Sequence, residues 1–427
     1  MDKFRSFGKI IFEKSNVAVF CILAMTAGFL TSPAVCSIGV IVFGFNGIRD
    51  INPKQWFKKT WWLLGALWIA CYAVTWFWSA DKGYWSTRLQ VKLPFLIMPL
   101  AFSFLSGFSA RQLRLITVAM GLMLVCGAGY SVGFLLRDFE YYMIEYKYSH
   151  LLPTPVRGDH IRFSLSIAFY LIWCATIWNS LQFRWIKVLI AVFDAALFVY
   201  LHILSAKSGL LAVYLFLTLW CFYLIFTKKR IYGFLISAGL IIGIGICAKF
   251  IPTFSERMAY IKVTWIAMKS GDRSGTYGDL SRLISYDIAV KLIGENPVRG
   301  TGVGNMQTAM THGYETWFPL VPDDNRLLPH NQFLIVALGC GLPAAAAFLV
   351  WFFYPLFKLR RTREGFFLFA TWMIMLVQLC IEPMLEVQFG VYVFLFFLLM
   401  QWHLMTHGTP EESETQSATR LLFSRNK

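Results

Sequence analysis

Long apolar runs alternate with short polar segments along most of this chain. A helix that crosses the hydrocarbon core of a bilayer, about 30 Å thick, needs about 20 apolar residues. We identify twelve candidate stretches, at residues 17–31, 33–48, 61–79, 90–107, 113–136, 161–180, 185–204, 208–226, 231–250, 330–357, 365–383 and 386–405. The pattern predicts an all-α integral membrane protein with about twelve transmembrane helices. The closely spaced pair at 17–48 is alternatively a re-entrant hairpin.

Composition and charge support this fold class. Hydrophobic residues make up 57% of the 427 residues and charged residues only 15%, against roughly 25% charged in a soluble domain. This deficit fits a bilayer, where a buried charge is expensive and backbone groups must be paired inside helices. The net charge of +16 could also indicate nucleic-acid binding. However, outside residues 252–329 the basic residues concentrate in alternate loops, which indicates topology and attraction to anionic membrane lipids instead.

The alternating basic loops predict the orientation of the chain. An even number of spans places both termini on one side, and the positive-inside rule makes that side cytoplasmic. Residues 1–16 are basic and run into the first span without a small-residue cleavage site, so we expect a retained helix. Residues 406–427, rich in Ser, Thr and Glu, are expected to form a disordered cytoplasmic tail. The predicted organisation is therefore nine helices within 1–251, a periplasmic loop at 252–329, three helices within 330–405, and the tail.

The cysteine pattern gives no sign of a disulfide or zinc framework. All nine cysteines lie in or beside apolar stretches, none lies in the long loop, and no CxxC pair occurs. We therefore expect neither disulfides nor bound zinc.

Two outer segments are candidates for function. Residues 137–160 are rich in tyrosine and end in Pro-Thr-Pro-Val-Arg-Gly-Asp-His. Residues 252–329 are far longer than an ordinary connection, and such loops are usually functional. Within them, Leu283, Ile284, Ile288 and Leu292 recur at helical spacing. This spacing predicts an amphipathic helix over 280–293 that lies along the membrane.

Arg282 and His330 are the strongest candidate functional residues. Arg282 falls in the first turn of the predicted helix, with Asp279 or Ser281 as its N-cap. A guanidinium offers a fixed fork of donors that matches phosphate oxygens, although an exposed arginine paired with a nearby carboxylate is the simpler reading. His330 opens an apolar run directly after Pro329. Imidazole is suited to proton transfer near neutral pH, and the alternative is a capping or packing histidine.

Other polar residues lie in or beside the spans. Lys207, in a very short outer loop, either snorkels to the interface or lines a polar cavity. His160 and Arg162 enter the span at 161, where interfacial anchoring alone explains them. Asp194 and His202 are eight residues apart, roughly on one face of the same span. Polar groups inside a membrane are functional candidates by default, but a structural hydrogen bond between helices explains this pair equally well.

The glycine-rich run Gly300-Thr-Gly-Val-Gly304 resembles a nucleotide-binding loop only weakly. No strand precedes it and no Lys-Ser/Thr follows it, as a phosphate-binding loop requires. It follows Asn296-Pro297, and glycines permit the positive φ angles of a tight turn. We therefore predict a turn and reject nucleotide binding.

In combination, these motifs resemble the O-antigen ligase and polymerase superfamily of bacterial envelope glycosyltransferases. The resemblance is carried by Asp-Leu-Ser-Arg282, by Ile-Gly-Glu-Asn-Pro-Val-Arg-Gly-Thr-Gly-Val-Gly-Asn305, by Pro-His330-Asn-Gln-Phe-Leu, and by Gly339-Cys-Gly-Leu342. The superfamily shows an arginine, a glycine turn after Asn-Pro, a His-Asn motif that opens a helix, and a Gly-Leu shortly afterwards. The specific part covers about 65 residues of the chain, and outside it the resemblance is one of topology.

The resemblance implies glycan transfer on the periplasmic face of the bacterial inner membrane. The implied donor is a polysaccharide linked through diphosphate to undecaprenol, and in a ligase the acceptor is a sugar hydroxyl of lipid A–core. His330 would take the acceptor proton as general base, while Arg282 and a second cation would hold the diphosphate leaving group. The donor is already activated, so no ATP, metal or other cofactor is implied.

The second cation is where this sequence departs from the family. The family often carries a Ser-Arg-Gly-like element at a short outer loop, where this chain has Ser205-Ala-Lys207-Ser-Gly. Lysine keeps the charge but loses the bidentate fork. Lys207 is therefore the first candidate and Arg162 the second, with His160 and Asn331 completing the predicted substrate-binding set.

Other functions remain open at this point. A polymerase of the same superfamily would add repeat units to a lipid-linked chain, and a third member type would glycosylate protein hydroxyls. A lipid-linked glycan transporter or flippase would also use about twelve helices, but the sequence shows no paired halves and no matching broken helices.

Overall fold

The computed structural model describes residues 13–49, 51–148, 150–156, 158–227, 230–270 and 278–408, and within these ranges the regular structure is entirely helical. The expected N-terminal segment before Glu13 and the expected tail after Gly408 lie outside the described residues. The α-helices are α2 (Lys14–Thr31), α3 (Pro33–Ile48), α4 (Thr60–Val74), α5 (Lys82–Lys92), α6 (Pro94–Phe102), α7 (Ala110–Arg137), α8 (Phe139–Lys147), α9 (His160–Ile177), α10 (Arg184–Leu204), α11 (Lys207–Phe226), α12 (Arg230–Phe250), α13 (Pro252–Lys269), α14 (Gly278–Glu295), α15 (Met306–Trp317), α16 (Gln332–Cys340), α17 (Leu342–Phe357), α18 (Arg363–Ile381) and α19 (Gln388–His407). Short 3-10 helices are η1 (Pro53–Lys58), η2 (Thr75–Trp78), η3 (Trp178–Ser180), η4 (Val303–Asn305), η5 (Asp323–Asn325) and η6 (Met384–Glu386).

The described residues contain nine helices that are long and apolar enough to cross a membrane, and α3 and α17 are shorter apolar helices. The prediction of a multi-pass all-α protein is therefore confirmed, whereas a count of twelve spans is not. Helix α3 has 16 residues and is about 24 Å long, shorter than the hydrocarbon core. The hairpin reading of α2 and α3, which Ser32 alone connects, thus stays beside the two-span reading.

The predicted span at 90–107 is not one helix. The chain forms α5 and α6 instead, which meet at Leu93. Pro94 opens α6 at its first position, where its missing N–H costs nothing, and its ring disfavours continuation of the preceding helix. Helix α5 is polar enough to lie outside the candidate spans.

The predicted span at 330–357 is also broken, at Gly341. Its φ of 83° ends α16 and begins α17. A Cβ atom at this position would lie 2.1 Å from the carbonyl oxygen of Val298, so the glycine is required by both conformation and space. The predicted glycine turn packs into this break, where the Thr301 amide donates to Leu338 O at 2.7 Å. Gly300 and Gly302 adopt φ angles of 65° and 86°, which confirms the predicted positive φ.

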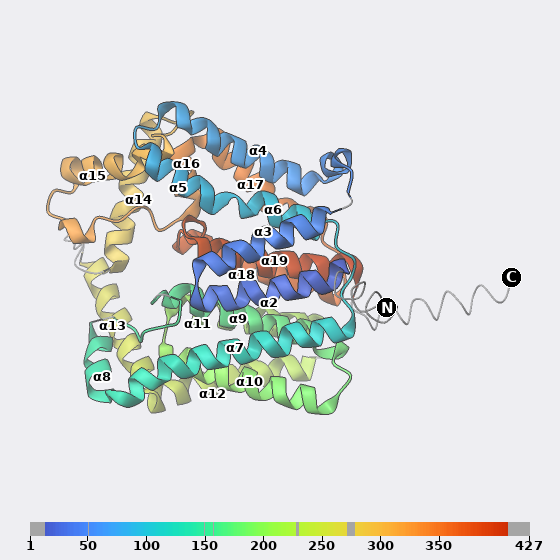
Figure 1. The fold of residues 1–427 in the computed structure, drawn as a ribbon. Helices are drawn as coiled ribbons and strands as arrows, with labels where there is room; N and C mark the ends of the chain where they lie inside the picture. The colour runs from blue at the N-terminus through green and yellow to red at the C-terminus, as the bar shows by residue number, and fades with distance from the viewer. Residues whose placement is uncertain are drawn as a thin grey trace.

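The helices form a bundle with two distinct ends. Helices α8, α13, α14 and α15 gather at one end (Figure 1). The predicted cytoplasmic loops meet at the opposite end, which we call the basic end: Gln112 donates to Asn16 at 2.7 Å, Lys59 to Ser103 O at 3.0 Å, and Arg360 to Met405 O at 3.2 Å. The alternation of the basic loops therefore agrees with the arrangement of the helices.

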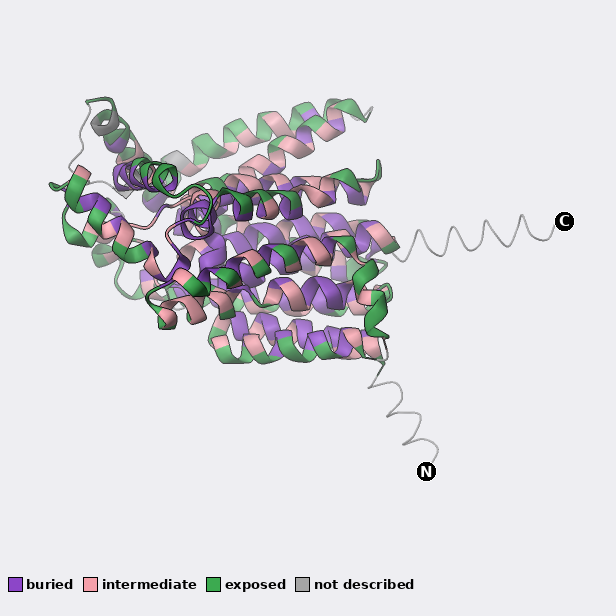
Figure 2. Ribbon diagram, turned by 90° about the horizontal axis from the view of Figure 1, so that it is seen from above, coloured by how far each residue is buried: buried purple, intermediate pink, exposed green. Residues whose placement is uncertain are grey.

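Helix α19 lies at the centre of the bundle and α12 at its edge. In the most apolar 18-residue segment of α19, 89% of the residues are buried, against 6% in the corresponding segment of α12. Figure 2 shows the same gradient, with buried residues concentrated in the inner helices and exposed residues on the outer ones. Aromatic packing joins α4, α6 and α17 to this core, for example between Trp68 and Phe95, whose ring centroids are 4.8 Å apart.

The predicted loop at 252–329 is largely helical. Helix α14 covers the amphipathic helix predicted over 280–293 and exceeds it by two residues at each end. Its buried positions include Leu280, Ile284, Ile288 and Leu292, whereas Leu283 is 42% exposed. Leu283 therefore lies beside the buried face, on which positions recur every four residues. Arg282 is the fifth residue of the helix and lies beyond its first turn, and the predicted cap at Asp279 concerns a side chain outside the described residues.

Candidate active site

His330 is held by contacts to two other helices. Asn331 caps α16, its side chain accepting from the Phe333 and Leu334 amides at 2.9 and 3.1 Å. The same side chain donates to Cys380 O in α18 at 3.1 Å. The Tyr286 hydroxyl of α14 donates to His330 O at 2.7 Å. Asn331, a predicted substrate-binding residue, thus fixes the backbone on which the histidine sits.

A buried carboxylate, Glu382, joins the candidate residues. It follows α18, and its backbone amide donates to Gln378 O at 2.9 Å. Its Oε2 atom lies 3.1 Å from His330 Nδ1 and 3.4 Å from Arg282 Nη2. Its Oε1 atom lies 3.5 Å from Arg162 Nη1. The structure therefore brings together His330, Arg282 and Arg162 around one residue that the sequence analysis missed.

The charge state of Glu382 fixes the tautomer of His330. Burial on its own raises the pKa of the Glu382 carboxyl, but the His330 hydrogen bond and the charges of Arg162, His330 and Arg282 hold the pKa below the ordinary value of 4.5. An ionised carboxylate only accepts hydrogen bonds. His330 Nδ1 must then be the donor, and in the neutral imidazole the lone pair lies on Nε2, which is the nitrogen that can take a proton.

Arg162 is nearly enclosed. Asp159 caps α9 by accepting from the Arg162 amide at 3.1 Å, and its Oδ1 lies 3.4 Å from Arg162 Nη1. Arg162 is 8% exposed, and its buried Nε has no hydrogen-bond partner among the residues that the structure describes. Its ion pairs, at 3.4 and 3.5 Å, are longer than the 2.7–2.9 Å of tight charge-assisted bonds. The guanidinium therefore retains donor capacity for an incoming anion.

Lys207, the first candidate for the second cation, begins α11. Its Nζ lies 5.6 Å from the centre of the Tyr260 ring. The neighbouring Ser208 O accepts from Gln378 Nε2 at 3.1 Å. Gln378 is in the last turn of α18, four residues before Glu382. The start of α11 thus lies beside the same end of α18, while Arg162, the second candidate, pairs with Glu382 directly. His160 is the first residue of α9, two residues before Arg162.

A second ion cluster lies next to the His330 segment. Lys92 Nζ is 2.8 Å from Glu386 Oε1, and Arg88 Nη1 is 4.0 Å from Glu386 Oε2. Gln332, two residues after His330, donates to Glu386 Oε1 at 2.8 Å and accepts from the Leu385 amide at 2.9 Å. The Lys92 side chain is fully buried. The sequence analysis did not single out these residues, because Lys92 falls inside a predicted apolar span.

Asp194 and His202 do not join this cluster of contacts. His202 is bonded to the Tyr214 hydroxyl at 2.6 Å and to Phe198 O at 2.8 Å, which supports the structural reading. Asp194 lines a cavity of about 610 Å³ together with Arg363. Arg363 opens α18 and Glu382 follows it, so the two ends of this helix are about 27 Å apart. The cavity therefore extends toward the basic end, away from His330.

Residues 192–349 match the family model described as O-antigen ligase. The match covers less than half of the chain. It includes Lys207, Arg282, the glycine turn and His330, but neither Arg162 nor Glu382. No protein of known annotation matches the chain.

Proposed function

Through residues 192–349 the chain belongs to the O-antigen ligase superfamily, and from that premise we propose that it is a ligase acting on lipopolysaccharide. The reaction would transfer a polysaccharide from undecaprenyl diphosphate to a sugar hydroxyl of lipid A–core. The active site would face the periplasm, since it lies at the end opposite the basic loops. A multi-pass helical bundle suits a donor and an acceptor that are both membrane lipids.

The observation that carries this proposal is the contact of His330, Arg282 and Arg162 with one buried carboxylate. Glu382 Oε2 lies 3.1 Å from His330 Nδ1 and orients the imidazole. In the neutral ring, Nε2 then has a lone pair that can accept the acceptor proton. A general base contributes about 10²–10⁴-fold to a rate when it is positioned in this way. The carboxylate also stabilises the imidazolium that forms when the proton arrives.

The reaction then follows from these groups. The acceptor O–H gives its proton to His330 Nε2 while its oxygen attacks the anomeric carbon of the donor. The bond from that carbon to the diphosphate oxygen breaks, and the leaving group departs with the electron pair. Arg282 and Arg162 would hold the charge that develops on the diphosphate. Because both guanidiniums are fixed before reaction, little reorganisation is needed, and such donors stabilise the transition state.

A complementation experiment tests the proposal. A strain lacking its own ligase would express the wild-type chain, His330→Ala or Arg282→Ala at equal protein levels, and lipid A–core would be separated on gels. We expect polysaccharide on lipid A–core with the wild type and none with either variant. Chains that lengthen while staying on the lipid carrier would identify a polymerase instead. A purified protein that moves the lipid-linked glycan across vesicles but transfers nothing in detergent would identify a transporter.

A further inference from the structure

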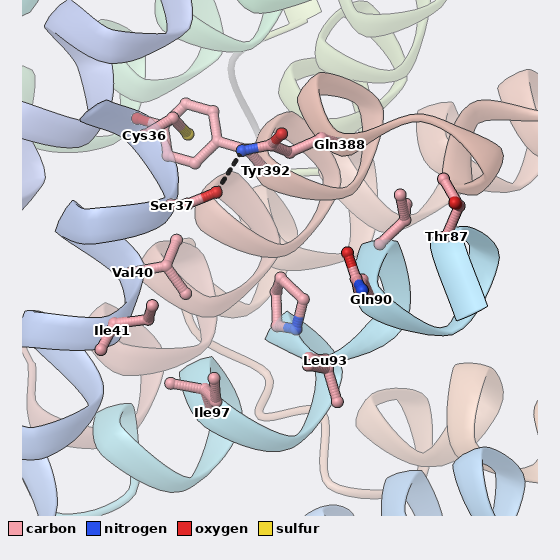
Figure 3. A pocket seen from close by; sticks show the side chains of 12 residues that line it. Cys36, Ser37, Val40, Ile41, Thr87, Gln90, Leu93, Ile97, Gln388 and Tyr392 are labelled. Atoms are coloured by element: carbon pink, nitrogen blue, oxygen red, sulfur yellow. Dashed lines mark hydrogen bonds between the residues drawn. The ribbon is translucent and has the colours of Figure 1, made fainter. Parts of the chain in front are cut away.

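Two adjoining cavities follow the seam between α3 and α6. The first, of about 350 Å³, is lined by α3, α5, α6 and α19 (Figure 3). The second, of about 240 Å³, continues along α3 and α6 to Trp56 and Trp62. Ile41 and Ile97 line both cavities. We call this pair of adjoining cavities the α3–α6 groove.

The groove is polar at one end and apolar along the rest. Ser37, Thr87, Gln90 and Gln388 line the first cavity, and Gln388 Nε2 donates to Ser37 Oγ at 2.7 Å (Figure 3). The second cavity is lined by aliphatic and aromatic residues. Gln388 follows η6, so the polar end lies at the same end of the bundle as Glu382. An occupant must therefore have a polar head at that end and a hydrocarbon body toward the basic end.

The groove opens sideways. The α3 residues along its edge are large, apolar and exposed: Ile38 is 60% exposed, Ile41 47% and Phe45 69%. In a bundle that crosses a membrane, exposed apolar surface of this extent is favourable against the hydrocarbon of the bilayer. A lipid can thus enter from the bilayer without leaving the hydrocarbon phase.

The length of the groove favours a single long chain. Its lining residues on α3 run from Cys36 to Ile48, which corresponds to about 18 Å along the helix axis. One leaflet contributes only about 15 Å of the hydrocarbon core. A chain that fills the groove is therefore longer than one leaflet of the hydrocarbon core is thick.

The polar end of the groove adjoins the cationic side of α5. Thr87, Gln90 and Val91 face the groove, whereas Arg88 and Lys92 on the same helix pair with Glu386. Gln332 connects Glu386 to the segment that carries His330. A charged head group that leaves the groove at this end thus lies on one side of α5, the helix whose Arg88 and Lys92 pair with Glu386.

We propose that the α3–α6 groove holds the polyisoprenoid chain of the donor lipid, so that its diphosphate emerges beside α5. This inference rests on the proposed function and adds the place where the lipid carrier is recognised. Recognition of the chain here would explain how an enzyme with a membrane-facing groove selects a polyisoprenoid over abundant phospholipids.

Two synthetic donors test the inference with the full-length protein in detergent. They carry the same diphosphate-linked sugar, on either a long polyisoprenoid or a chain of two isoprene units. We expect wild type to show at least a tenfold lower KM for the long donor. Ile41→Trp fills the wall shared by both cavities and should abolish this preference by raising KM for the long donor. Val42→Trp is the matched control, because Val42 is 43% exposed on the same helix and lines neither cavity.

The outcomes separate the two claims. No transfer from either donor by wild type would overturn the proposed function. Transfer with equal KM for both donors would overturn only the groove assignment, as would Ile41→Trp and Val42→Trp behaving alike. A measurement independent of folding in the variants is photo-crosslinking of wild type with a long donor that carries a diazirine about 18 Å along the chain from the diphosphate, the length of the groove. Labelling should fall on the segment from Phe45 to Trp62, and labelling elsewhere contradicts the inference.

Discussion

His330 Nδ1 and Glu382 Oε2 lie 3.1 Å apart, although 52 residues separate them in the chain. The contact joins the segment before α16 to the segment after α18, and it selects the tautomer that leaves Nε2 able to accept a proton. In the proposed mechanism His330 is the general base, and Glu382 orients its imidazole ring.

Replacing the carboxylate should therefore impair the chemistry more than the binding. In Glu382→Gln the side-chain amide is able to donate to Nδ1 and favour the wrong tautomer, so we expect kcat to fall by about 10²–10⁴-fold with a small change in KM. Glu382→Asp, which keeps the charge, should retain more activity. Steady-state transfer by purified protein measures this, and equal kcat for wild type and Glu382→Gln would contradict the orienting role.

The two arginines should each be needed as forks of donors. Arg162→Lys and Arg282→Lys keep the charge but lose the planar guanidinium, and removing one fixed donor from such a site costs about 10²–10³-fold in kcat. Arg326→Lys is the matched control in the same outer segment, since Arg326 pairs with the exposed Asp323 at 2.8 Å. If Arg162→Lys were as active as this control, Lys207 rather than Arg162 would be the better candidate for the second cation that holds the diphosphate.

The free energy of unfolding should decrease at low pH because of Glu382. Its pKa is held below 4.5 in the folded protein, so the native state binds the proton less readily than the unfolded chain does. The stabilisation is fully present above the unfolded pKa and is lost as pH falls through the lower folded pKa. Thermal unfolding in detergent between pH 7 and about pH 3 should show this fall in wild type. A Glu382→Gln curve with the same slope would mean that other carboxyls carry the effect.

The ion pair between Lys92 and Glu386 should behave as a coupled unit. Removing Lys92 leaves Glu386 paired with the more distant Arg88, at 4.0 Å, and removing Glu386 leaves both cations without this carboxylate. Loss of one partner from a buried pair costs about 3–5 kcal/mol. We expect Lys92→Met and Glu386→Gln each to lower Tm strongly, and the double variant to be more stable than the sum of the two losses predicts. A double-mutant cycle by thermal unfolding measures this coupling, and strict additivity would show that the pair is not coupled.

The sequence predicted the elements whose signal is local. Helix α14 repeats its buried positions every four residues, and the glycine turn shows its conformational demand in its composition. Arg282 and His330 stand out because they are polar residues beside apolar runs. Each of these inferences needed only a short window of the chain.

The remaining features depend on packing between distant segments. Glu382 ends one apolar run in a sequence with no visible partner, and its role arises only when α9, α14 and α16 place three basic side chains around it. Lys92 lies inside a stretch whose apolar composition predicts a span. The helix break at Gly341 is set by the close approach of Val298 O, a contact that the local sequence does not reveal. Counting apolar residues detects none of these contacts.

The cluster forms late in translation, because Glu382 is synthesised after the three basic residues that it contacts. Arg162, Arg282 and His330 have all left the ribosome before it does, and synthesis proceeds at about 5–20 residues per second. Until that late carboxylate arrives, the imidazole has no fixed orientation and the two guanidiniums have no common counter-charge. Under the proposed mechanism, a polypeptide that ends before Glu382 would therefore transfer no sugar, and activity would begin only when the bundle is nearly complete.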